Sequence, residues 1–179
     1  GDMHSMLDSV TSMCSGYVPV AGDGCNSGLY FQAYINIPDG AFDWRTIRDF
    51  DFDSLDPDVE HADHMPDFSF LSDDAFVSDI DGFSEVDRYI MRWEGSFAAG
   101  ATGPYGFSTN SDDGSMLYID GVVIVDNDGV HAANRVDGSV QLTAGSHDIV
   151  ITFFENSGGA LLEVTFTPPG GSETVLSAD

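Results

Sequence analysis

Hydrophobic and polar residues alternate along much of the chain, beginning at Gly28. Leu29, Phe31 and Ala33 fall on one face of an extended segment that continues to Ile37, and such alternation predicts a half-buried β-strand. Strand-like runs recur over residues 89–97, 106–109, 116–119, 122–125, 139–142, 147–155 and 161–167. No stretch keeps a helical period of 3.6 residues over three turns.

Turn-forming residues separate these segments, among them Asp120-Gly121, Asn127-Asp128-Gly129 and Asp137-Gly138. Short strands spaced about 8 to 12 residues apart, with Gly and Asp in the turns, are typical of antiparallel sandwiches and barrels. A length of 179 residues suits one domain with a full core. We therefore expect an all-β fold, an antiparallel β-sandwich, as a single domain over residues 1–179.

Residues 42–85 differ, because they carry many acidic residues without a sustained β pattern. We expect a long acidic loop excursion there, with a short helical turn near residues 74–78. Its residues 49–60 place acids with the 1, 3, 5 and 12 spacing of an EF-hand loop. Ser54 stands where that loop requires glycine and Pro57 interrupts it. A solvated acidic loop is therefore favoured, and a structural calcium ion is the alternative.

The charge is lopsided, with 31 acidic residues against 5 basic ones and a formal net charge of −26. Such a surface repels phosphate backbones and anionic lipids, so we expect no nucleic-acid partner and no membrane insertion. The 31 acids are 25 Asp and 6 Glu. Because Asp favours turns and the chelation of hard cations, this ratio indicates a loop-rich protein that uses calcium.

Residues 1–25 bear on the compartment in which the protein is found. Gly1 to Met6 resemble a remnant of cloning, so an export signal is expected outside this sequence. Cys14 and Cys25 lie close together in a Gly- and Ser-rich stretch, where a local disulfide and two free thiols are both open. A disulfide would favour an extracellular setting.

Two adjacent carboxylates, Asp112 and Asp113, stand at the start of a predicted strand. Like charges in contact raise one pKa unless a cation neutralises them. A cis peptide bond would bring both side chains to one side, and a calcium ion held by both acids would give a reason for such a bond. Taken alone, the pair is better explained as part of a tight turn.

The surrounding residues change that balance. They include the segments Arg92-Trp93-Glu94-Gly95, Gly103-Pro104-Tyr105-Gly106, Ser111-Asp112-Asp113-Gly114, Leu142-Thr143-Ala144-Gly145 and Phe153-Phe154-Glu155-Asn156. In their order and spacing, and from about Gly28 to Pro169, they resemble the PA14 family, which is named for a domain of anthrax protective antigen. The resemblance implies a β-sandwich, in agreement with the strand pattern.

In the lectin branch of the family, calcium is held by a cis Asp-Asp pair and by a second loop. The resemblance assigns Asp112 and Asp113 to the pair, the Asn156 amide oxygen to the second loop, and the carbonyls of Gly158 and Ala160 as further ligands. Calcium accepts about 6–8 oxygen ligands, which leaves room for two adjacent hydroxyls of a sugar ring. Ser157 and His131 are further candidates for ligand contact.

We expect a calcium-dependent lectin domain of a secreted or surface adhesin, extracellular and a monomer within a larger adhesin. Its partners are neutral sugars of the fucose, mannose, glucose or galactose type, because the net charge disfavours anionic glycans. Enzymatic activity is not expected, since no nucleophile motif or opposed carboxylate pair is apparent. The alternative is a non-lectin structural or protein-interaction module in which calcium only fixes loops.

Several other residues are candidates for binding. The loop 126–134 offers Asp128, His131 and Asn134 for sugar selection, and Phe31, Tyr105 and Tyr118 are candidate stacking faces, with Phe31 and Tyr118 favoured as core. Trp44 and Trp93 are favoured as core. His61 and His64 have zinc-ligand spacing but lack a third strong ligand, so they are expected to be surface residues.

Overall fold

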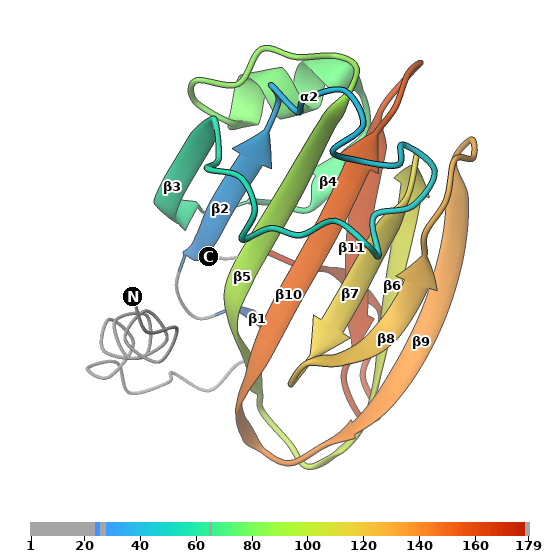
Figure 1. Ribbon diagram of the computed structural model, residues 1–179. Helices are drawn as coiled ribbons and strands as arrows, with labels where there is room; N and C mark the ends of the chain where they lie inside the picture. Colours follow the sequence, from blue (N-terminus) through green and yellow to red (C-terminus); the bar gives the residue numbers. More distant parts are fainter. Residues whose placement is uncertain (1–23, 26–27, 65, 178–179) are drawn as a thin grey trace.

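The computed structural model describes residues 24–25, 28–64 and 66–177, in which two antiparallel sheets pack face to face (Figure 1). The seven-stranded sheet runs in the order β3 (Val59–His64), β2 (Leu29–Tyr34), β5 (Tyr89–Ala99), β10 (Gly145–Glu155), β7 (Ser115–Ile119) and β8 (Val122–Asn127), with β1 (Gly24–Cys25) beside β5. The five-stranded sheet runs in the order β12 (Thr174–Val175), β11 (Leu161–Thr167), β6 (Gly103–Asp112) and β9 (Asn134–Leu142), with β4 (Ser69–Phe70) beside β11. The predicted antiparallel β-sandwich is confirmed.

The main core fills the space between the sheets with side chains from alternate strand positions. Met91 and Trp93 point inward from β5, and Ile149, Ile151 and Phe153 point inward from β10, each at most 1% exposed. Burying a large apolar side chain is worth roughly 1.5–3 kcal/mol, so this alternation fixes which face of each strand meets the other sheet. Phe31 and Tyr105 are also core residues.

A second apolar layer lies on the outer face of the seven-stranded sheet. The segment between β2 and β3 crosses that face, drawn in teal in Figure 1, and packs Ile47 and Phe50 onto Ile90, Met116 and Phe154. Asp128 anchors this segment, since its carboxylate accepts the Thr46 hydroxyl at 2.5 Å and the Ile47 N–H at 2.7 Å. Trp44 is half-buried in the same layer.

The acidic region over residues 42–85 is only partly a loop. The expected helical turn is present as α2 (Asp73–Asp79), but β3 and β4 also fall in this region and were not predicted. Among the described strands, β3 is the last of the sheet and pairs only with β2. Because an edge strand tolerates charged residues, Glu60 and Asp63 hide its alternation.

Two carboxylates within residues 49–60 have structural partners in this fold. In the described part of the chain, no helix flanks residues 49–60. Asp58 accepts the N–H groups of Ile35 and Asn36 at 2.7 and 3.0 Å, and Glu60 accepts the Tyr30 hydroxyl at 2.6 Å. These two carboxylates therefore support the β2 strand and its end.

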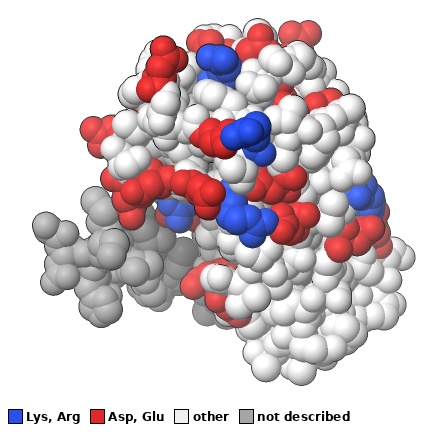
Figure 2. Space-filling model, turned by 45° about the vertical axis from the view of Figure 1, so that its right-hand side comes forward, with Lys and Arg blue, Asp and Glu red and all other residues white. Residues whose placement is uncertain are grey.

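Charge covers the surface unevenly. Figure 2 shows carboxylates over the upper part of one face with arginines among them, and a lower end nearly free of charge. Arg48 pairs with Asp126 at 2.5 Å, Arg92 with Glu94 at 2.5 Å and Arg135 with Asp137 at 2.8 Å. Arg45 pairs with Asp43, whereas Arg88 lies over the ring of Trp44, so four of the five arginines are neutralised by a neighbouring carboxylate. Within the described residues, no helix has the length and apolar character needed to cross a membrane.

Candidate functional site

Asp112 and Asp113 lie at the end of β6, and the peptide bond between them is cis. The Asp113 side chain is buried, with 3% exposure of the residue. Its two oxygens accept backbone N–H groups from two different loops, His131 at 2.9 Å and Asn156 at 3.0 Å. Asp113 therefore joins the β8–β9 loop to the β10–β11 loop.

Glu155, which was not predicted as a site residue, is the third carboxylate of the site. Its Oε2 accepts the Asp113 N–H at 3.1 Å, and its Oε1 is buried without a hydrogen-bond partner in the described part of the chain. Oxygens of Asp112, Asp113 and Glu155 all lie within 4.8 Å of one another. Its position in β10 is the signal by which the sequence could have revealed it. Glu155 lies two and four residues after the inward-facing Phe153 and Ile151, so its side chain points to the same side of the strand.

The electrostatics of this acidic trio favour a cation. Burial, then the Asp113 carboxylate, raises the pKa of Glu155 to about 8. The same two causes raise the pKa of Asp112 above its usual value. A divalent cation would offset both, and a set of oxygen donors with one orphaned buried oxygen suits a hard ion such as calcium. The residues present therefore fit that ion.

The β10–β11 loop is held by two acids that the sequence interpretation did not assign to it. Asp87 accepts the Gly158 N–H at 2.9 Å, and Asp73, in the first turn of α2, accepts the Ala160 N–H at 3.1 Å. Gly158 has a φ of 121°, which a side chain rarely permits. The path of this loop is thus set by Asp73, Asp87 and Asp113 together.

The structure brings only some of the predicted residues into direct contact. Asn156 and His131 reach Asp113 through their N–H groups. Gly158 and Ala160 lie on the same loop as Asn156, and Ser157 is exposed there. The ring nitrogens of His131 face the carbonyl oxygens of Asn127 and Ala132 at 3.1 and 3.0 Å, so its ring lies against its own loop.

The other candidates for sugar selection have structural contacts. Asp128 anchors the segment that crosses the outer sheet face. Asn134 donates to the Asn127 side chain at 2.8 Å, and the Asn127 amide donates to the Asn134 carbonyl at 2.8 Å. Both residues therefore shape the loop that carries His131. Cys14 lies outside the described residues, so both alternatives for the cysteines, a Cys14–Cys25 disulfide and two free thiols, stay predictions.

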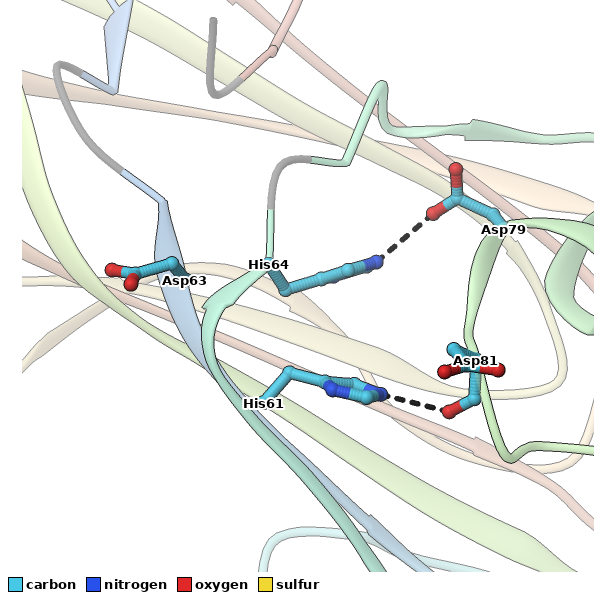
Figure 3. Close-up of a pocket in the computed structure, with 5 residues that line it drawn as sticks. All are labelled: His61, Asp63, His64, Asp79 and Asp81. Atoms are coloured by element: carbon cyan, nitrogen blue, oxygen red, sulfur yellow. Dashed lines mark hydrogen bonds and ion pairs between the residues drawn. The ribbon is translucent and has the colours of Figure 1, made fainter.

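The histidine pair, His61 and His64, lines a hollow of about 320 Å³ together with Asp63, Asp79 and Asp81 (Figure 3). His64 is not the expected surface residue, since it is 9% exposed. Its Nδ1 accepts the Trp93 indole N–H at 2.9 Å and its Nε2 faces Asp79 at 3.0 Å. His61 Nε2 donates to the Asp81 carbonyl at 2.8 Å.

These contacts account for the orientation of both histidine rings without a zinc ion. Because an indole N–H can only donate, His64 Nδ1 must be unprotonated and Nε2 must carry the hydrogen. The zinc hypothesis gains no third ligand, since Asp112, Asp113 and Glu155 are the group of potential metal ligands that the described residues bring together. His64 instead ties β3 and α2 to the core tryptophan.

This tautomer predicts a pH dependence of stability. Burial lowers the pKa of His64 despite the nearby Asp79 and with a small contribution from His61. The folded state therefore binds fewer protons, and its stability should fall as the pH drops below about 6.5, the ordinary value for histidine. Thermal melts of the wild type and His64→Asn at pH 7 and pH 5 check this, because Asn keeps an acceptor for Trp93 and cannot titrate.

We expect the His64→Asn protein to lose less stability than the wild type on this change of pH. His61→Asn is the matched control, and it should retain the wild-type pH dependence. Equal losses for the wild type and His64→Asn would contradict the assignment.

Comparison with known proteins identifies the fold family. The family model for the PA14 domain matches residues 48–179. This chain belongs to the PA14 family. The PA14 sugar-binding domain from an RTX adhesin has a similar structure, with a TM-score of 0.70 and 19% identity, over 85% of this chain and 96% of that one. At such identity the likeness shows the shared fold.

Two further relatives differ in their settings. The epithelial adhesin 6 A domain (Epa6A) from Candida glabrata, solved in complex with Galβ1-3GlcNAc, has a TM-score of 0.61 and 14% identity, over 88% of this PA14 chain and 90% of that one. The anti-sigma-I factor RsgI3 of Acetivibrio thermocellus is 24% identical over 157 residues, or 86% of this chain. This chain spans only 21% of that relative.

Proposed function

We propose that this PA14 domain is a calcium-dependent carbohydrate-binding domain of a secreted or cell-surface adhesin. The observation that carries the proposal is the acidic trio, with its orphaned Glu155 oxygen, at the meeting point of two loops. The fold shared with an adhesin sugar-binding domain and with Epa6A supports it. These relatives also favour a binding role over a catalytic one.

In this proposal Asp112, Asp113, the Asn156 amide oxygen and the carbonyls of Gly158 and Ala160 hold the ion. Calcium, when bound, supplies open coordination positions for two adjacent sugar hydroxyls. The carboxylates of Asp112 and Asp113 accept charge-assisted hydrogen bonds from those hydroxyls. Asp113 can do so while it accepts two N–H groups, because each carboxylate oxygen has two lone pairs.

Glu155 supports the Asp112–Asp113 pair through the backbone of Asp113. Its Oε2 fixes the Asp113 N–H, and its buried Oε1 faces no other donor among the described residues. We assign it the role of positioning Asp113 and adding negative charge at the ion. His131 and Asn156 contribute by holding Asp113 in place through their N–H groups.

The preferred ligands are neutral sugars of the fucose, mannose, glucose or galactose type. A net charge of −26 disfavours sialylated or sulfated glycans at long range. Because binding through a diol buries little apolar area, each site is expected to be weak. Strong attachment to a cell then requires several copies in one adhesin.

A glycan array tests this function, with the domain applied once in calcium and once in a chelator. We expect neutral glycans to be bound in calcium only, and their sialylated forms to be bound more weakly. Binding that persists unchanged in chelator, or no binding to any glycan, would contradict a calcium-dependent lectin.

The second candidate is a non-lectin module in which calcium fixes loops. The similarity to an anti-sigma factor, over most of this chain, favours it. This candidate predicts that calcium raises the melting temperature while no glycan is bound in the same preparation.

A further inference from the structure

A second hollow, of about 390 Å³, lies on the outer face of the seven-stranded sheet. Its floor is made by Arg92 of β5, Val150 and Thr152 of β10 and Tyr118 of β7. Thr152 lies beside Arg92 and Val150 beside Tyr118 in the strand register. The segment over residues 47–53 walls the hollow, which shares no lining residue with the acidic trio.

We propose that this hollow binds one ring of a neutral saccharide without a metal ion. The proposal goes beyond the calcium-dependent function and does not depend on it. The volume lies at the lower end of the range for small-molecule sites, about 300–1,000 Å³. Three features of the hollow suit a sugar: the hydroxyls of its floor, the charges of its lining and the ring of Tyr118.

Two hydroxyls of the floor lack a strong partner. Thr152 is 4% exposed, and its Oγ1 has no hydrogen-bond partner among the described residues. The Tyr118 hydroxyl donates to the Met116 sulfur at 3.1 Å, and a thioether is a weak acceptor. A buried hydroxyl without a partner costs free energy, so a ligand that brings oxygen atoms into the hollow would be favoured.

The charges of the lining select a neutral ligand. Arg48 and Arg92 line the hollow, but each already pairs with a carboxylate, Asp126 and Glu94 respectively. Asp51 and Asp53 also line the hollow, so the two positive and two negative charges of the lining balance. Sugar hydroxyls both donate and accept, and can therefore use arginines and aspartates together, whereas the net charge of the chain repels anions.

Tyr118 offers an apolar face for the sugar ring. Tyr118 was favoured as a core residue, but it is only half-buried, on the outward side of β7 and against the second apolar layer. It forms no ring pair with another aromatic residue in the described part of the chain, whereas Phe52 is covered by Arg92 at 5.1 Å. The Tyr118 ring is therefore the stacking surface.

Nuclear magnetic resonance titration in chelator tests the proposal. The probes are methyl β-glucoside, methyl β-galactoside and methyl α-mannoside, with methyl β-glucuronide as the anionic counterpart. We expect at least one neutral glycoside to shift the backbone amides of Phe52, Tyr118 and Gly121 in the wild type and equally in Asp112→Asn. If the proposed calcium-dependent function were wrong, this result would still be expected.

Matched variants complete the test. Thr152→Val removes only the hydroxyl, Tyr118→Leu removes the ring, and each should weaken binding about 3- to 10-fold. Tyr30→Leu, at another half-buried tyrosine outside the hollow, should bind as the wild type does. The proposal is overturned if no neutral glycoside shifts these amides, if only the glucuronide does, or if all three variants behave alike.

Discussion

Asp112→Asn is expected to weaken calcium binding on the order of 100-fold and to remove calcium-dependent sugar binding, while the domain stays folded. Asp112 is half-buried, and its carboxylate receives a backbone hydrogen bond from Ala133. Asn keeps the size and one acceptor oxygen but removes a charge from the acidic trio. Calcium affinity depends strongly on the number of charged ligands, so a large loss follows.

The change in melting temperature with calcium measures this effect. For the wild type, calcium at 100 times its dissociation constant should add about 2.7 kcal/mol of stability. For a chain of this size, that corresponds to a rise of roughly 5–10 °C. Asp112→Asn should show almost none of this rise at the same calcium concentration.

Two other variants make the result interpretable. Asp39→Asn removes the same charge at an exposed position and should keep the full calcium response. Asp113→Asn should lower the melting temperature even without calcium, because Asp113 accepts N–H groups from both loops. If Asp112→Asn retained the wild-type calcium response and sugar binding, the ion would have to lie elsewhere.

Gly138→Ala should be the most damaging small substitution for the fold. A Cβ atom at Gly138 on β9 would overlap the carbonyl oxygen of Ile124 and lie 2.8 Å from its carbonyl carbon. β8 and β9 belong to different sheets, so this contact lies where the two sheets approach each other. Backbone atoms cannot give way as a flexible side chain can.

We expect a loss of roughly 3 kcal/mol or more, since overpacking of this kind costs about 1–3 kcal/mol even where side chains can adjust. Chemical denaturation of the purified variant measures it. Gly106→Ala on the neighbouring β6 is the control, because its Cβ would meet Thr167 at an ordinary 3.5 Å. Equal stabilities of the two variants would show that β8 can move away from β9.

The strands were predictable where apolar and polar residues alternate and turn-forming residues bound the segment. β5, β7, β8, β10 and β11 follow the alternation of residues, and the Asp120-Gly121 turn has the positive φ angles, 50° and 75°, that a tight hairpin requires. β3 was missed because an edge strand with one partner can carry charges on both faces. The wall that residues 47–53 build over the outer sheet face has no local signal at all.

For the site, the sequence by itself predicted the acid pair and, through its resemblance to the family, the loop that follows β10, because the residues of each lie side by side in the chain. Only the tertiary structure decided that Glu155 joins the pair, that Asp73 and Asp87 hold the second loop, and that His64 serves Trp93. These contacts join residues 29 to 87 positions apart. Sequence alternation sets which way a side chain points, whereas the packing of the two sheets and their loops sets what it meets.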